Sequence, residues 1–185
     1  MTGDVAPIYF SEGESLLGPI LAATTLKGIC YIALDNHRNQ MLNTLQSKFQ
    51  GAPLIEGGSQ IQGLMVQIVD FITSPRIGFD PKLDASGTPF QLRVWGALKS
   101  IGVGSIASYT QIASMIGSPK AIRAVASACA ANSIAIAIPC HRIVCKNGEI
   151  SGYRWGISRK KELLAREQAA LRENFQNSHS RSKVP

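Results

Sequence analysis

Three absences narrow what this sequence can encode. No apolar run approaches the roughly 20 residues that a membrane helix needs, and the opening stretch MTGDVAPIYFSEGES is acidic and polar, unlike a secretory or transit signal. The four cysteines form no C-x-x-C pair, and their spacing to the three histidines fits no zinc finger. We therefore expect a cytoplasmic protein (nuclear in a eukaryote) with free thiols.

Acidic residues are scarce in the second half of the chain. Residues 1–87 carry five Lys and Arg against eight Asp and Glu, whereas residues 88–185 carry fourteen against four. A mildly acidic half followed by a strongly basic one indicates that the second half binds a polyanion such as nucleic acid. A basic surface that is merely solvated remains the alternative on charge alone.

A stretch rich in Pro, Gly, Asp and Ser, residues 73–87, predicts a boundary between two domains. The first domain, 1–87, reads as a small α/β unit without a catalytic constellation, and we interpret it as a scaffold. Its predicted elements are two strands within 16–35 that meet at a turn at Lys27-Gly28, a helix at 38–49, and a helix that a capping box at Ser59 and Gln62 begins.

The second domain, 88–173, is predicted to be mainly helical, and the polar tail 174–185 is expected to be disordered. Thr88 is a good N-cap, with Pro at the first helical position and Gln91 completing a capping box. Two shorter helices, at about 109–116 and 118–130, flank a turn at Gly117. This layout is that of a helix-turn-helix, although an ordinary helical hairpin fits the spacing equally well.

The second of these short helices is unusually slim. Ile122, Val125 and Cys129 predict its inner stripe, and alanines occupy most of the remaining surface. A slim helix with one long cation, Arg123, can approach a nucleic-acid backbone closely and insert its guanidinium into the base stack. An arginine that is only solvated is the alternative.

An apolar run at 133–138 leads into IPCHRIVC and is predicted to be buried and extended. The residues after it, RIVCKNGEISGY, resemble a hairpin with its turn at Asn147-Gly148, which would form a wing beside the two helices. The final helix is expected to start at Ser158. Glu167 falls within its apolar stripe, so this carboxylate needs a buried partner.

Cys140, His141 and Glu167 together predict a nucleophile with a controlled proton. The thiolate is the reactive form of cysteine, and a neighbouring imidazole can accept the thiol proton directly or through a water. An imidazole is in turn oriented well by a carboxylate. Such a relay follows the logic of a cysteine hydrolase, although adjacent Cys and His are unusual there.

The segments SYTQIA, SPKAIRAVASACAAN, IPCHRIV and GEISGYRWGISRKKELLAREQ together resemble the O6-alkylguanine-DNA alkyltransferase family, and most closely its Ada-type alkyltransferase domain. The resemblance is strong over about 88–170 and weaker before it. It implies an N-terminal α/β domain with ribonuclease-H-like topology and a mainly α C-terminal domain with a winged helix-turn-helix. It also implies repair of O6-methylguanine, and less well O4-methylthymine, in duplex DNA by a protein that acts once per molecule, with no metal or organic cofactor. We expect it to act as a monomer.

The resemblance also implies roles for individual residues. Cys140 matches the alkyl acceptor, His141 its water-mediated base, and Glu167 the residue that orients the histidine. Asn132 matches the residue that ties the recognition helix to the active-site turn, and Tyr109 one that hydrogen-bonds the flipped base. The expected DNA contacts are Arg123, which fills the vacated stack, with Tyr109, Ser118, Lys120, Ala121 and Arg142; the expected substrate pocket comprises Cys129, Ile143, Tyr153, Arg154, Trp155 and Lys160.

Two further expectations concern specificity and rival functions. Trp155 stands where mammalian-type members have a smaller residue, so we expect it to narrow the pocket and to favour methyl over benzyl adducts. No zinc phosphotriester module precedes the domain, so gene regulation is not expected. The main alternative function is a non-catalytic module that binds alkylated DNA and flips the base without chemistry, and a Cys-His-Glu hydrolase is a third.

Overall fold

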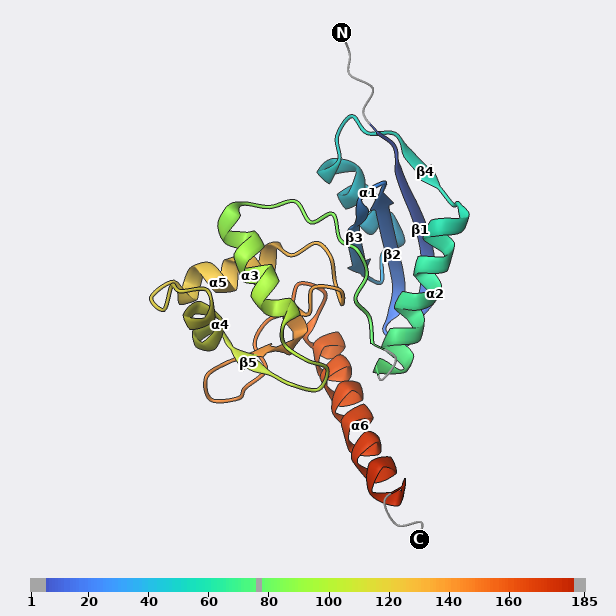
Figure 1. Ribbon diagram of the computed structural model, residues 1–185. Helices are drawn as coiled ribbons and strands as arrows, with labels where there is room; N and C mark the ends of the chain where they lie inside the picture. The colour runs from blue at the N-terminus through green and yellow to red at the C-terminus, as the bar shows by residue number, and fades with distance from the viewer. Residues whose placement is uncertain (1–5, 76–77, 182–185) are drawn as a thin grey trace.

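The computed structural model describes residues 6–75 and 78–181 of the chain (Figure 1). A four-stranded mixed sheet near the N-terminus is followed by a helical region and a long terminal helix (Figure 1). In chain order the elements are β1 (Ile8–Ser15), β2 (Gly18–Thr25), β3 (Gly28–Leu34), α1 (Arg38–Lys48), β4 (Leu54–Glu56), α2 (Ser59–Thr73), α3 (Pro89–Lys99), β5 (Ala107–Ser108), α4 (Tyr109–Met115), α5 (Ile122–Ala131), a 3₁₀ turn (Cys140–Arg142), β6 (Ile143–Val144) and α6 (Ile157–Arg181).

The sheet has the order β3-β2-β1-β4, with β1, β2 and β3 antiparallel in sequence and β4 parallel to β1. The two strands expected within 16–35 are confirmed as β2 and β3. Strand β1 was not predicted from the sequence. Its Ile8 and Phe10 are buried at alternate positions, but most of the residues after them in the strand are polar. Strand β4, which is too short to give a periodic signal, was not predicted either.

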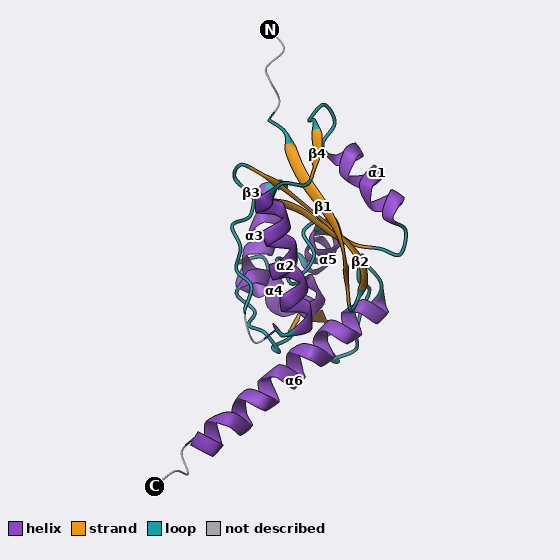
Figure 2. Cartoon of the chain, turned by 90° about the vertical axis from the view of Figure 1, so that its right-hand side faces the viewer, coloured by secondary structure: helices purple, strands orange, loops and turns teal. Residues whose placement is uncertain are grey.

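Helices α1 and α2 lie on opposite faces of the sheet (Figure 2). The apolar face of α2 is confirmed, with Ile61, Ile68 and Ile72 fully buried. The capping box expected at Ser59 is wrong. Ser59 is already the first helical residue, and Gly58, at φ 104°, is the N-cap and has no side chain to cap with.

Capping boxes are present at the N-termini of both α3 and α4. Thr88 and Gln91 satisfy each other's backbone N–H groups as expected. Ser108 and Gln111 do the same at the start of α4. Trp95 of α3 is buried and donates its indole N–H to the Ala128 carbonyl at 2.9 Å, which joins α3 to α5.

Helix α5 begins at Ile122, later than expected. Residues 118–121 form a turn closed by the Ala121 N–H on the Ser118 carbonyl, at 2.9 Å, with Pro119 inside it. The predicted inner stripe is right for Val125 and Cys129 but wrong for Ile122, which is exposed. Ile122 is the first residue of α5, and the buried stripe starts one turn later at Val125.

The run 133–138 is buried as expected but is not extended. Only Ile134 bridges to Ile32 of β3, and the chain then turns through Ile136 at φ 69°. A short buried apolar run does not distinguish strand from turn by pattern alone. The linker covers β3 as well: Ile29 and Leu83 form a second bridge. The edge of the sheet is therefore closed by the segments that lead into and out of the helical region.

The predicted hairpin after Cys140 is wrong as a pair of strands. A tight reversal does occur, with the Cys145 N–H on the Glu149 carbonyl at 2.8 Å. The strand β6 that precedes it, however, pairs in parallel with β5 instead of with the returning chain. Residues 149–153 form no strand, so no two-stranded wing forms in this part of the structure.

Helix α6 continues to Arg181 and extends away from the rest of the molecule (Figures 1 and 2). The disordered tail expected from 174 is thus helical as far as 181, because neither Gly nor Pro interrupts the sequence there. Residues 182–185 of that expected tail lie outside the described residues. Among the described helices, none is long and apolar enough to cross a membrane.

Candidate active site

Cys140 lies at the start of the 3₁₀ turn, at the bottom of a pocket of about 380 Å³. The pocket is built by the start of α4, one face of α5 and the loop before α6. Its lining residues are Tyr109, Ala126, Cys129, Ala130, Cys140, Gly152, Tyr153 and Arg154. The structure therefore brings together four of the expected pocket and catalytic positions from α4, α5 and the loop, around the expected nucleophile.

Asn132 connects helix α5 to the turn that carries Cys140. Its Nδ2 donates to the Cys140 Sγ at 3.2 Å and to the Ile138 carbonyl at 2.9 Å, while its Oδ1 accepts the Ile134 N–H at 2.8 Å. Every polar atom of this fully buried amide is engaged. The tie between helix and turn that the resemblance implied is thus present in the geometry.

The Cys140 thiol is held in its protonated form at neutral pH. Burial raises its pKa from 9.0 to about 11, against the opposing effects of the Asn132 hydrogen bond and the positive charge of Lys160. All four cysteines are free thiols. Because the thiolate is the nucleophile, Cys140 needs a base at the moment of reaction.

His141 and Glu167 supply such a base and its orientation. The His141 Nε2 lies 2.9 Å from the Glu167 Oε1, and both side chains are fully buried. Burial lowers the pKa of His141, so the imidazole is neutral. Glu167 is anionic: burial alone would raise its pKa, but hydrogen bonds from His141 and Arg142 bring it to about 2. An anionic partner accepts from Nε2–H, which leaves the Nδ1 lone pair free to take a proton.

Arg142 is the second partner of Glu167. Its Nε donates to Oε2 at 2.9 Å and its Nη2 to Oε1 at 2.8 Å, while Nη1 donates to the Ile101 carbonyl. The Gly104 N–H completes the carboxylate's shell at 3.0 Å. Arg142 was expected to contact DNA, but its guanidinium is buried and donates to Glu167 and to the Ile101 carbonyl. It balances the charge of Glu167, which allows His141 to stay neutral.

Three of the residues expected in the pocket, Ile143, Trp155 and Lys160, do not line it. Tyr153 lines the pocket and contacts Trp155 edge to face at 5.1 Å between ring centroids. Trp155 itself is buried behind Tyr153 and does not line the pocket, but it contacts two residues that do: the Tyr153 ring, and the Arg154 guanidinium 5.9 Å from the Trp155 ring centroid. Ile143 is likewise buried away from the lining. Cys129 lines the pocket as expected, and burial raises its pKa to about 12.

Lys160 is fully buried behind the pocket, and its Nζ reaches Ser151 Oγ at 3.2 Å. Ser151 in turn contacts the Tyr109 hydroxyl at 2.8 Å. Ser151 was not among the site residues predicted from the sequence. A serine in a loop between two glycines carries no pattern that would distinguish it from a solvated turn residue.

The expected DNA-contacting residues lie on and around α5. Arg123 and Lys120 are exposed, and Ser118 and Ala121 are half-buried in the turn before the helix. Arg123 precedes Ala126 and Ala130 by three and seven positions, which places it on the helix face that lines the pocket. An exposed cation thus lies on the same helix face as two residues that line the pocket.

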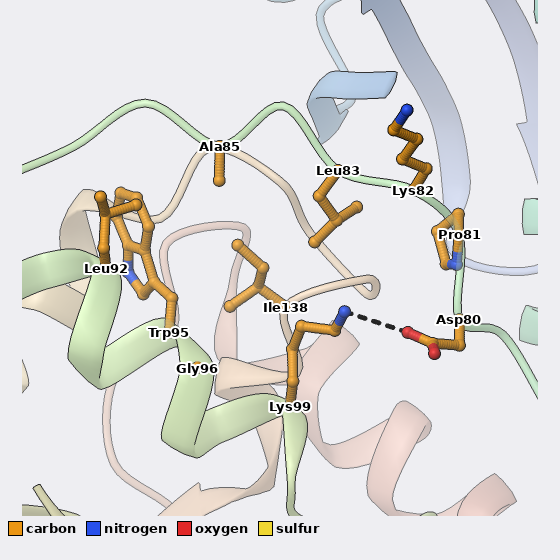
Figure 3. Close-up of a pocket in the computed structure, with 10 residues that line it drawn as sticks. All are labelled: Asp80, Pro81, Lys82, Leu83, Ala85, Leu92, Trp95, Gly96, Lys99 and Ile138. Carbon is orange, nitrogen blue, oxygen red and sulfur yellow. Dashed lines mark ion pairs between the residues drawn. The ribbon is translucent and has the colours of Figure 1, made fainter. Parts of the chain in front are cut away.

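A second pocket, of about 490 Å³, lies between the linker and α3 (Figure 3). Trp95 and Ile138 face linker residues such as Leu83 across it, and Lys99 pairs with Asp80 at 3.0 Å (Figure 3). Although this pocket is larger, none of its lining residues is a nucleophile with an adjacent base. Within the described part of the chain, no group of three or more His, Cys, Asp or Glu side chains is placed to hold a metal ion.

A buried cysteine with a neutral histidine base lies beside a two-helix unit with exposed cations, so a candidate cysteine nucleophile is next to a surface suited to nucleic acid. Residues 89–169 match the family model described as "6-O-methylguanine DNA methyltransferase, DNA binding domain". The inducible methylated-DNA–protein-cysteine methyltransferase of Bacillus subtilis is 37% identical over 152 residues, which cover 82% of this chain and 85% of that protein. The chain belongs to the family of methylated-DNA–protein-cysteine methyltransferases.

Two further comparisons agree with this assignment. The crystal structure of Mycobacterium tuberculosis OGT in complex with DNA superposes with a TM-score of 0.73 at 32% identity, covering 88% of this chain and 94% of that one. The bifunctional transcriptional activator/DNA repair enzyme Ada of Escherichia coli is 41% identical over 165 residues. Those residues are 89% of this chain but 47% of Ada, so the chain spans about half the length of that relative.

Proposed function

We propose that the protein repairs DNA by transferring the alkyl group of O6-methylguanine, and less well of O4-methylthymine, from duplex DNA to Cys140. The observation that carries this proposal is the pocket itself. A buried thiol lies at its base, hydrogen-bonded to Asn132 and adjacent to a neutral histidine that a carboxylate orients. The names of the relatives that cover most of the chain support the same reaction.

The reaction proceeds by in-line displacement. His141 takes the Cys140 proton at Nδ1, through a water in the manner that the family resemblance implies. The thiolate attacks the methyl carbon, a C–S bond forms, the C–O bond breaks, and its electron pair remains on the guanine oxygen. The guanine then takes up the proton. The product is a thioether that nothing in the site can reverse, so each molecule acts once.

The target base must leave the duplex before the thiol can reach it. Extruding a base costs a few kcal/mol, and Arg123 beside the pocket offsets part of that by filling the gap in the stack. The neighbouring turn, with Ser118, Lys120 and Ala121, contacts the DNA backbone. Arg123→Ala should slow repair of duplex DNA by roughly tenfold and spare the reaction with free O6-methylguanine base. An equal loss on both substrates would contradict the role of Arg123.

We also infer the finer fold labels. The order β3-β2-β1-β4, with β2 antiparallel to its neighbours, supports a ribonuclease-H-like topology for domain 1–87. The unit α4-turn-α5 with its exposed cations supports a helix-turn-helix in domain 88–173. The protein works as a monomer on DNA in the cytoplasm, or in the nucleus of a eukaryote.

Mass spectrometry tests the proposed function directly. The protein is mixed with a duplex that contains O6-methylguanine and is then digested. A methyl group should appear on the peptide that contains Cys140 and should be absent from the peptide that contains Cys30. Cys140→Ala should lose the modification and keep DNA binding. Binding without any mass increase in the wild type would instead favour a non-catalytic module, and repeated turnover on acyl substrates would favour a hydrolase.

A further inference from the structure

A chain of hydrogen bonds runs from a buried cation to the wall of the Cys140 pocket. Lys160 Nζ lies 3.2 Å from Ser151 Oγ and 3.5 Å from the Gly152 carbonyl. Ser151 Oγ lies 2.8 Å from the Tyr109 hydroxyl, and Tyr109 lines the pocket. Lys160 is fully buried, and none of the described residues forms an ion pair with it. The positive charge of Lys160 therefore acts on the Ser151 hydroxyl and, through it, on the Tyr109 hydroxyl.

The hydrogen-bond donors and acceptors indicate which group donates at each step of this series of hydrogen bonds. The Lys160 ammonium has three donors and no acceptor, so it donates to Ser151. Ser151 then retains one hydrogen, and the only other hydrogen-bond partner of its hydroxyl among the described residues is the Tyr109 oxygen. Each direction leaves one hydroxyl hydrogen without an acceptor among the described residues. If Tyr109 donates, that hydrogen is on Ser151, which does not line the pocket; if Ser151 donates, it is on Tyr109, which does and can offer it to a ligand. The arrangement that suits a bound ligand therefore runs from Lys160 to Ser151 to Tyr109.

We propose that Ser151 is a positioning residue that couples the Lys160 cation to Tyr109 and directs the Tyr109 proton into the pocket. Once the Tyr109 oxygen accepts from Ser151, its own hydrogen is free for a ligand. A cation at the start of the chain polarises both hydroxyls in the same sense, which strengthens the final donor.

This role rests on the proposed function. As the bond from methyl carbon to guanine oxygen breaks, negative charge grows on the departing base. A preorganised donor at the pocket wall stabilises that charge more than it stabilises the uncharged substrate. Ser151 thus affects the rate of methyl transfer through Tyr109, without touching the reacting atoms.

A purely structural role for Ser151 would give a different result in a double-mutant cycle. The full-length wild type, Ser151→Ala, Tyr109→Phe and the double variant are compared in single-turnover methyl transfer from a saturating O6-methylguanine duplex. Ser151→Ala should slow transfer about tenfold, less than the loss of a direct donor, with unchanged affinity for the duplex. In the Tyr109→Phe background, which already lacks the proton, Ser151→Ala should cause no further loss.

Two additional variants control the experiment. Ser151→Thr keeps the hydroxyl and should restore most of the rate, whereas Ser158→Ala removes an exposed serine at the start of α6 and should have no effect. Equal losses from Ser151→Ala in both backgrounds, or no rescue by threonine, would overturn the role of Ser151 alone. No methyl transfer by the wild type would overturn the proposed function instead.

Discussion

The two halves of the molecule bury different kinds of side chain. Around the sheet, the buried residues are almost all apolar, and Thr24 is the one buried polar side chain described there. The helical half buries His141, Arg142, Lys160 and Glu167, all ionisable. Burying a charge is costly unless it is paired and hydrogen-bonded. The first half therefore owes its stability to packing, whereas the second maintains a costly polar network that only its chemistry explains.

The two halves also differ in the surroundings of a buried thiol, Cys30 in the first and Cys140 in the second. Burial raises the pKa of Cys30 to about 12, and the charge of Asp84 acts in the same direction. Burial also raises the pKa of Cys140, but only to about 11, because Asn132 and the cations Lys160 and Arg154 oppose it. Cys30 is thus a small apolar side chain in a core, while Cys140 is surrounded by groups that favour its thiolate.

Of the variants considered, Glu167→Gln should have the largest effect on both stability and methyl transfer, because it disrupts the buried polar network of the helical half. Neutralising the carboxylate leaves the Arg142 guanidinium buried without a counter-charge, at a cost of about 4 kcal/mol in the free energy of unfolding. It also removes the anion that fixes the His141 tautomer, so methyl transfer should fall by roughly 100-fold or more. Chemical denaturation and single-turnover transfer measure the two effects.

The matched control is the exposed pair of Arg38 with Glu12 in the sheet half, 3.1 Å apart. Glu12→Gln should change the free energy of unfolding by less than about 1 kcal/mol and leave transfer unchanged. Comparable destabilisation by the two variants would show that burial does not separate these ion pairs.

Ile68→Ala should separate stability from chemistry in the first half. Ile68 on α2 is fully buried against the sheet, and its truncation should cost about 3 kcal/mol through the lost burial and the cavity left behind. Transfer per folded molecule should stay the same, because none of the residues that line the pocket belongs to α2. Val66→Ala on the same helix, where the side chain is 59% exposed, should cost less than about 0.5 kcal/mol. A slower transfer rate in folded Ile68→Ala would mean that the sheet half does more than support the site.

How much of this could be predicted depends on whether the signal is local. The capping box at Thr88 and the apolar stripe that holds Glu167 are written within a few residues, and both were predicted correctly. The pairing of Glu167 with Arg142 spans 25 positions and depends on the turn at 140–142, so sequence placed Arg142 on the DNA instead. Ser151 was missed for the same reason.

Acid should weaken the helical half before the sheet half. The folded-state pKa of Glu167 is about 2, below its ordinary 4.5, so its contribution to stability is present above about pH 4.5 and is lost as the pH falls toward 2. The lowered pKa of His141 acts in the same direction below pH 6.5. The temperature of the unfolding midpoint of the wild type should therefore decrease as the pH is lowered from 6.5 to 2. Glu167→Gln should show a flatter profile, and a steeper one would contradict this assignment.

The smallest expected effect concerns which lesion the protein prefers. It tests whether Trp155, which does not line the pocket, restricts the pocket through Tyr153. Trp155 holds Tyr153 in place through an edge contact, 5.1 Å between centroids at 67°. Trp155→Phe removes part of that support, so the Tyr153 ring can yield and the ratio of benzyl to methyl transfer should rise by roughly threefold. Competition between duplexes carrying the two lesions measures the ratio. Tyr153→Phe is the matched control, because it keeps the ring and removes only a buried hydroxyl that has no partner among the described residues. An unchanged ratio in Trp155→Phe, or equal rates with both lesions in the wild type, would show that Trp155 does not restrict the pocket.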